Sequence, residues 1–213
     1  GYNISSVKLL YENEKKKLSK KTMFLDPVSV TGYQIYDTRM KVNLDKPIRP
    51  RGGKIKIEID WSFISPDYGS DRMGVLETKN GRIFNLAQWY PRMCVYDDIL
   101  GWNTLPYLGA GEFYLEYGTF DIHINVPSDH IVVCSGGLLN PEEVYTKNQM
   151  QLLEKAAKSD ETVIIRGADE INDPYSRPSE NDRITWKFKI ENSRDVAWSS
   201  SSSFILDASG VFP

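Results

Sequence analysis

Strict alternation of apolar and polar residues is the strongest pattern in the chain. In the stretch 54–63, KIKIEIDWSF, every odd-numbered position is an isoleucine or an aromatic residue, and every even-numbered position is charged or polar. The stretch 183–191, RITWKFKIE, repeats this design. Because a period of two places successive side chains on opposite faces, both stretches predict half-buried antiparallel strands.

The stretch 112–127, EFYLEYGTFDIHINVP, is a third candidate strand, in which the apolar positions change parity. They are odd-numbered from Phe113 to Tyr117 and even-numbered from Phe120 to Val126, and the change falls at Gly118. A glycine at such a switch is typical of a bulge or a sharp bend. Weaker strand patterns, separated by turn sequences, cover 28–36, 38–44, 82–88, 130–135, 162–166 and 203–207.

One segment has a helical composition. It begins at Asn140 and Pro141, carries two glutamates in its first turn and continues through strong helix formers to about residue 158. Many strands and one inserted helix, about 140–158, predict an all-β fold. We expect an N-terminal segment over 1–25 that can fray, followed by a single domain over 26–213, because no repeat or linker divides the chain.

Composition limits the classes of function. The chain has 213 residues, 40% of them hydrophobic, which is enough for a sizeable core without a disulfide or a metal. Its net charge of -3 argues against a nucleic-acid partner, since phosphate binding needs a concentrated excess of Lys and Arg. The basic cluster at 14–21 is more typical of a solvated segment. No stretch reaches the roughly 20 apolar residues of a membrane span, so we expect none.

No complete catalytic set is present in the sequence. The two histidines, His123 and His130, are too few for a metal site, and we expect no catalytic residue, metal or cofactor in this chain. The serine run 199–203 lacks a G-x-S-x-G elbow. Asp97 and Asp98 would point to opposite faces of a strand, which favours a role in capping a turn over a shared substrate.

The densest aromatic stretch, NLAQWYPRMCVYDDILGW at 85–102, is either part of the core or a recognition surface. It contains two Trp, two Tyr and Cys94, and the other cysteine of the chain is Cys134. Apolar residues flank both cysteines, and neither has the spacing of a metal site. Free, buried thiols are therefore the default interpretation.

Three blocks of sequence carry a family resemblance: AQWYPRMCVYDD (87–98), EFYLEYGTFDIHINVP (112–127) and RDVAW (194–198). In this order they resemble the N-terminal domain of the aminopeptidase N-like (gluzincin) zinc metallopeptidases, and above all the branch common in Bacteroidetes-type bacteria. The resemblance covers about residues 28–207. It implies a saddle-shaped, mostly antiparallel β-sandwich that precedes a thermolysin-like catalytic domain.

The catalytic motifs of that family, G-x-M-E-N and H-E-x-x-H, do not occur in this sequence. We therefore expect this chain alone to hydrolyse no peptide. The resemblance implies that the parent protein is a zinc aminopeptidase, with zinc in its own catalytic domain. That domain and a peptide substrate would be the partners of this chain. The family also favours a periplasmic or cell-envelope location, with the cytoplasm as the alternative.

Gln88 is the one substrate-binding residue that the resemblance implies. In the family, a Gln or Glu of this domain reaches the catalytic cleft and helps to hold the free α-amino group of the substrate. Such an ammonium requires acceptor oxygens once it is buried. Gln88, directly before WYP, is the matching residue. The alternative is an ordinary polar residue of a strand.

The residues around this position are expected to be structural. Those that match turn-shaping residues of the family are Tyr90, Pro91 and Asp97. From RDVAW we expect Arg194 or Asp195 to form a structural pair and Trp198 to lie in the core.

A second class of function stays open at this point. In a carbohydrate- or peptide-binding β-sandwich that acts by itself, an aromatic platform would be exposed in a row, formed by Trp89, Tyr90, Trp102 and Tyr107. The accessory-domain hypothesis predicts instead a largely apolar docking patch on one side.

Overall fold

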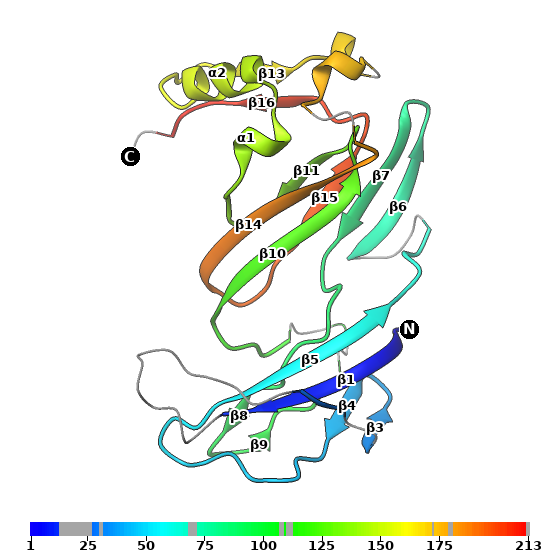
Figure 1. The fold of residues 1–213 in the computed structure, drawn as a ribbon, viewed down its shortest axis with the longest axis vertical. Helices are drawn as coiled ribbons and strands as arrows, with labels where there is room; N and C mark the ends of the chain where they lie inside the picture. Colours follow the sequence, from blue (N-terminus) through cyan, green and yellow to red (C-terminus); the bar gives the residue numbers. More distant parts are fainter. Residues whose placement is uncertain are drawn as a thin grey trace. The chain divides into compact units, whose positions relative to one another are not determined.

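The chain forms two compact units, which Figure 1 shows in a computed structural model. The described residues are 1–12, 27–29, 32–67, 72–106, 109, 113–171, 173–178 and 181–211. The first unit comprises Gly1–Ile64 and Trp102–Phe113, and the second comprises Ser65–Gly101 and Tyr114–Pro213. This division differs from the single domain predicted over 26–213. Each unit is assembled from two separate stretches, so no linker in the sequence marks the boundary.

The first unit holds a three-stranded antiparallel sheet and a separate hairpin. Its strands are β1 (Asn3–Tyr11), β2 (Val28–Ser29), β3 (Tyr33–Tyr36), β4 (Arg39–Val42) and β5 (Ile55–Ser62). β1 lies between β2 and β5, and β3 pairs with β4. The segment 1–25 was expected as one that can fray; in its described part, 1–12, β1 is paired on both edges and buries Val7 and Leu9. Residues 13–26, with the basic cluster, lie outside the described residues.

The second unit is an antiparallel β-sandwich with one apolar core. Its strands are β6 (Met73–Thr78), β7 (Gly81–Leu86), β8 (Tyr96–Asp97), β10 (Gly118–Pro127), β11 (Ile131–Cys134), β12 (Gly137–Leu138), β13 (Val163–Arg166), β14 (Arg183–Ser193), β15 (Trp198–Ser201) and β16 (Leu206–Ala208). Strand β9 (Gly101–Trp102) falls at the boundary between the units along the chain. One sheet has the order β10, β14, β12, and another has the order β11, β15, β7, β6. β13 pairs with β16.

The alternating stretches are strands, as predicted, and the apolar faces of β10 and β14 help to build the core of the second unit. Buried residues of β10, β11 and β14 form one cluster: Ile122, Ile124, Val126, Ile131, Val132, Ile184, Trp186 and Phe188. The register of β10 against β14 shifts between Gly118 and Phe120, where the parity of the sequence changes. Within the described part of this stretch, 113–127, only Gly118–Pro127 is a strand, so the strand begins later than predicted.

The predicted helix over 140–158 is present but interrupted. It consists of α1 (Pro141–Val144) and α2 (Lys147–Ala156), and α2 lies beside β13 (Figure 1). The Thr146 hydroxyl accepts from the Gln149 N–H, and the Gln149 side chain accepts from the Thr146 N–H. This capping box starts a second helix. Single-turn 3-10 segments follow at Ala168–Glu170 and Pro174–Ser176. Within the described residues, no helix is long and apolar enough to cross a membrane.

Candidate functional site

Gln88 lies in a bend just after β7, outside the strand predicted over 82–88. It is half-buried, and its backbone φ of 54° falls in the left-handed region. Few residues other than glycine adopt this region, and Gln is not among the types enriched there. Such a conformation costs about 1–3 kcal/mol and persists only where the surrounding structure fixes it. The backbone conformation of Gln88 is therefore not that of a regular strand residue.

Contacts on both sides of Gln88 fix this bend. On one side, the Ala87 N–H donates to the carbonyl oxygen of Arg72 at 3.1 Å. On the other side, the indole Nε1 of Trp89 donates to the carbonyl oxygen of Val196 at 3.2 Å. The backbone at Gln88 is therefore held between two anchored neighbours.

Asp195 makes most of the hydrogen bonds that hold the segment after Gln88. Its Oδ1 accepts from the Tyr90 hydroxyl at 2.9 Å and from the Val196 N–H at 2.8 Å. Its Oδ2 accepts from Arg92 Nη1 at 2.6 Å. Burial, and then the hydrogen bond to Asp195, raise the pKa of Tyr90. Asp195 thus forms the structural pair expected within RDVAW, whereas the Arg194 guanidinium lies 5.0 Å from the ring centre of Tyr117.

The aromatic rings of this region pack edge to face. Trp89 meets Trp198 with ring centres 6.1 Å apart and planes at 90°, and it meets Tyr90 at 5.2 Å and 62°. Tyr90 in turn meets Phe120 at 6.1 Å. The three sequence blocks of the resemblance therefore converge in one cluster. Trp89 and Tyr90 do not form a flat platform, and Tyr107 lies outside the described residues.

Comparisons with protein-family models, with curated protein sequences and with solved structures find no match to this chain. The candidate site consequently stands on its geometry: an amide-bearing side chain in a strained bend, between β7 and a packed cluster of Trp89, Tyr90, Arg92 and Asp195.

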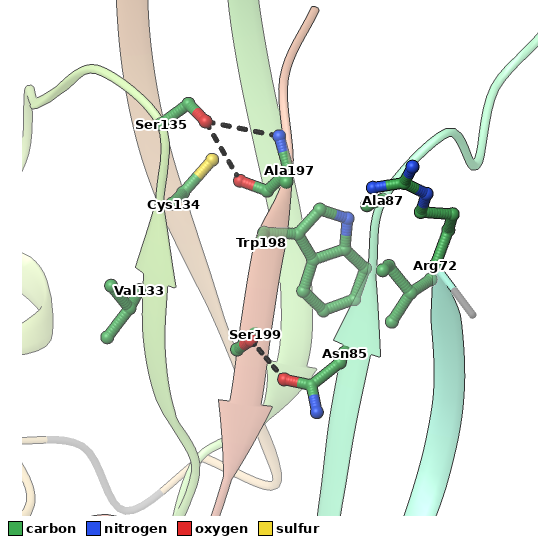
Figure 2. A pocket seen from close by; sticks show the side chains of 10 residues that line it. Arg72, Asn85, Ala87, Val133, Cys134, Ser135, Ala197, Trp198 and Ser199 are labelled. Carbon is green, nitrogen blue, oxygen red and sulfur yellow. Dashed lines mark hydrogen bonds between the residues drawn. The ribbon is translucent and has the colours of Figure 1, made fainter. Parts of the chain in front are cut away.

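A shallow hollow of about 380 Å³ lies on the sheet that contains β7, β15 and β11 (Figure 2). Asn85, Ser199 and Val133 are register partners across these strands, and the Ser199 hydroxyl donates to the Asn85 carboxamide oxygen. Ala87 also lines the hollow and is followed directly by Gln88. The surface at this end of β7 is therefore recessed beside the start of the bend.

Asp97 caps a turn, as expected. Its Oδ1 accepts from the backbone N–H groups of Ile99 and Leu100 at 3.0 and 2.7 Å.

The thiols of Cys94 and Cys134 are both free and half-buried, and burial raises the pKa of Cys134 to about 11. A thiol with so high a pKa is a poor nucleophile at neutral pH.

The two histidines lie in different environments. His123 is exposed on the polar face of β10, whereas the Nδ1 of His130 is 2.7 Å from the hydroxyl of buried Ser200. Ser200 belongs to β15, a strand that overlaps the serine run and that the alternation pattern did not reveal. In the part of the chain that the structure describes, no three His, Cys, Asp or Glu side chains are placed to hold a metal ion together.

The environment of His130 is expected to lower the free energy of unfolding in mild acid. Burial lowers its pKa below the ordinary 6.5; the charge of Asp129 opposes this shift, and those of Arg177 and Arg183 reinforce it. Since the unfolded chain binds the proton more readily, the contribution of neutral His130 is complete above about pH 6.5 and is lost as the pH falls through the folded-state pKa. Urea unfolding between about pH 8 and pH 5 should show this loss. The His130→Gln variant should lose less stability over the same range, and equal slopes would contradict the assignment.

Proposed function

We propose that this chain is the non-catalytic N-terminal domain of a zinc aminopeptidase-like protein. Its partners would be the catalytic domain of the same protein and a peptide substrate, whose free α-amino group Gln88 helps to hold. One observation carries the proposal: the residue that matches the amine-binding acceptor of the family occupies a strained backbone conformation that is anchored on both sides. Strain of this kind clusters at functional sites.

The chemistry of a carboxamide suits this role. An ammonium carries three donors and no acceptor, so it needs acceptor oxygens when a cleft removes it from water. The Gln88 side chain offers one carbonyl oxygen with two lone pairs. A bend that fixes the backbone reduces the entropy lost when this side chain meets a substrate. Zinc and the hydrolytic residues would belong to the catalytic domain.

The proposal is tested by the kinetics of the protein that contains both this chain and its catalytic domain. Gln88→Ala removes the acceptor, and we expect kcat/KM for peptides with a free amino end to fall about 10- to 100-fold, mainly through KM. Gln88→Glu retains an acceptor and adds a negative charge, so it should keep most of the activity.

Two controls sharpen this test. Gln88→Gly removes the same acceptor, so it should lose activity to the same extent as Gln88→Ala. Because glycine tolerates a positive φ, Gln88→Gly should unfold at a higher urea concentration than Gln88→Ala. Gln34→Ala removes an exposed amide from β3 of the first unit and should leave the kinetics unchanged. Unchanged kinetics in Gln88→Ala would refute the assignment of Gln88, and a gene without H-E-x-x-H beyond residue 213 would refute the assignment to this class of protein.

A further inference from the structure

We infer that Asp195 is a positioning residue for Gln88: its carboxylate anchors the segment 89–92 and thereby keeps Gln88 in the left-handed conformation. The consequence for substrate binding rests on the proposed function of Gln88. The structural part, that Asp195 controls the backbone at Gln88, does not rest on it.

Both oxygens of the Asp195 carboxylate accept hydrogen bonds from the segment that follows Gln88, and Oδ1 also accepts from the backbone N–H of Val196. Oδ2 accepts from Arg92 at 2.6 Å, and Oδ1 accepts from the Tyr90 hydroxyl at 2.9 Å. The Arg92 and Asp195 side chains are 15% and 33% exposed, so this pair is more shielded from water than an ordinary surface ion pair. The Ser193 hydroxyl donates to the Asp195 carbonyl oxygen at 2.7 Å and fixes the residue itself.

The Asp195 carboxylate can constrain the backbone of Gln88 because the residues that it binds lie only two to four positions further along the chain. Ala87 is tied to Arg72 on one side, and Tyr90 is tied to Asp195 on the other, which leaves Gln88 and Trp89 to join two fixed points. Trp89 is held in addition by its own bond to Val196, the residue after Asp195. If the carboxylate is lost, the segment after Gln88 loses its bonds from Tyr90 and Arg92 to Asp195. The φ of Gln88 is then expected to relax, because the left-handed region is disfavoured for an L-residue with a side chain.

Nuclear magnetic resonance of the 213-residue chain tests the structural part. In Asp195→Asn an NH2 donor replaces the Oδ2 that accepts from Arg92, and the negative charge is lost, whereas Oδ1 can still accept from Tyr90. We expect the Cα and Cβ shifts of Gln88 to move away from left-handed values and the indole hydrogen of Trp89 to exchange about 10-fold faster. Tyr90→Phe keeps the ring and removes one of the bonds, so it should produce a smaller change of the same kind and serves if Asp195→Asn folds poorly. Glu143→Gln breaks an exposed pair with Lys187 in the same unit and should move neither signal.

Kinetics of the protein with its catalytic domain test the consequence. Asp195→Asn should raise KM for peptides with a free amino end and change kcat little, which a loss of folded protein would not do. Unmoved Gln88 signals in both Asp195→Asn and Tyr90→Phe would overturn the inference. Moved signals with an unchanged KM would also overturn the positioning role, provided that Gln88→Ala raises KM. If Gln88→Ala leaves KM unchanged, the proposed function fails, and the resonance data alone decide whether Asp195 controls the bend.

Discussion

Replacement of Arg177 by methionine is expected to lower the free energy of unfolding by about 3–5 kcal/mol. Arg177 is 9% exposed, and its guanidinium donates to the carbonyl oxygens of Ser128, His130 and Val144 at 2.8, 3.1 and 3.3 Å. Burial lowers the pKa of Arg177 to about 10, so the group still carries its charge at neutral pH. Methionine has a similar length but leaves these three carbonyl oxygens without their donor.

Urea unfolding at pH 7 measures this effect, and two variants serve as controls. Arg177→Lys keeps a charge but cannot reach three carbonyl oxygens with the geometry of a guanidinium, so it should recover only part of the stability. Arg82→Met removes an exposed arginine that pairs with Glu77 on the surface and should change the free energy of unfolding by less than about 0.5 kcal/mol. A loss in Arg177→Met no larger than that in Arg82→Met would show that the three bonds contribute nothing.

Arg177 illustrates which parts of this fold a sequence pattern can predict. Period-two alternation correctly identified β5, β10 and β14, because their buried faces repeat at a spacing that the chain itself displays. Arg177 carries no such signal, since arginine is normally exposed. Its burial depends on carbonyl oxygens supplied by the turn before β11 and by α1, which the fold brings to it from 33 to 49 positions away.

Some elements were missed for reasons that lie in the sequence itself. β6, MGVLET, and β15, WSSS, lack an alternating apolar face, so their pairing with β7 is visible only in the sheet. The break between α1 and α2 did have a signal, because Thr146 and Gln149 match the Thr-x-x-Gln pattern of a capping box.

The resemblance singled out Gln88 as a candidate, but no pattern in the sequence predicted its backbone conformation. The sequence singled out Gln88 through its place before WYP, whereas the left-handed backbone there depends on tertiary contacts. The bond from Arg92 to Asp195 spans 103 positions, and that from Trp89 to Val196 spans 107. RDVAW indicated a structural pair without showing that its partner lies in the segment after Gln88. Only the folded chain shows that the two blocks form one anchor.

Replacement of Trp186 by alanine is expected to lower the free energy of unfolding by about 3–5 kcal/mol as well, through loss of packing. Trp186 is fully buried at the centre of the core. Its ring stacks on Phe188 at 6.3 Å between centres and meets the edge of Tyr145 at 5.3 Å, and the Arg177 guanidinium lies 5.8 Å from it. Alanine would leave a cavity under all three side chains.

Trp186→Phe separates packing from hydrogen bonding. Within the described residues, the buried Nε1 of Trp186 has no hydrogen-bond partner, so phenylalanine loses part of a ring but no bond. Its cost should therefore be about 1–2 kcal/mol, well below that of Trp186→Ala. A cost as large as that of alanine would mean that the indole nitrogen contributes to stability after all. Because Arg177 lies over the ring, the effects of Trp186→Ala and Arg177→Met should not add in the double variant, and strict additivity would show that the guanidinium and the indole stabilise the core independently.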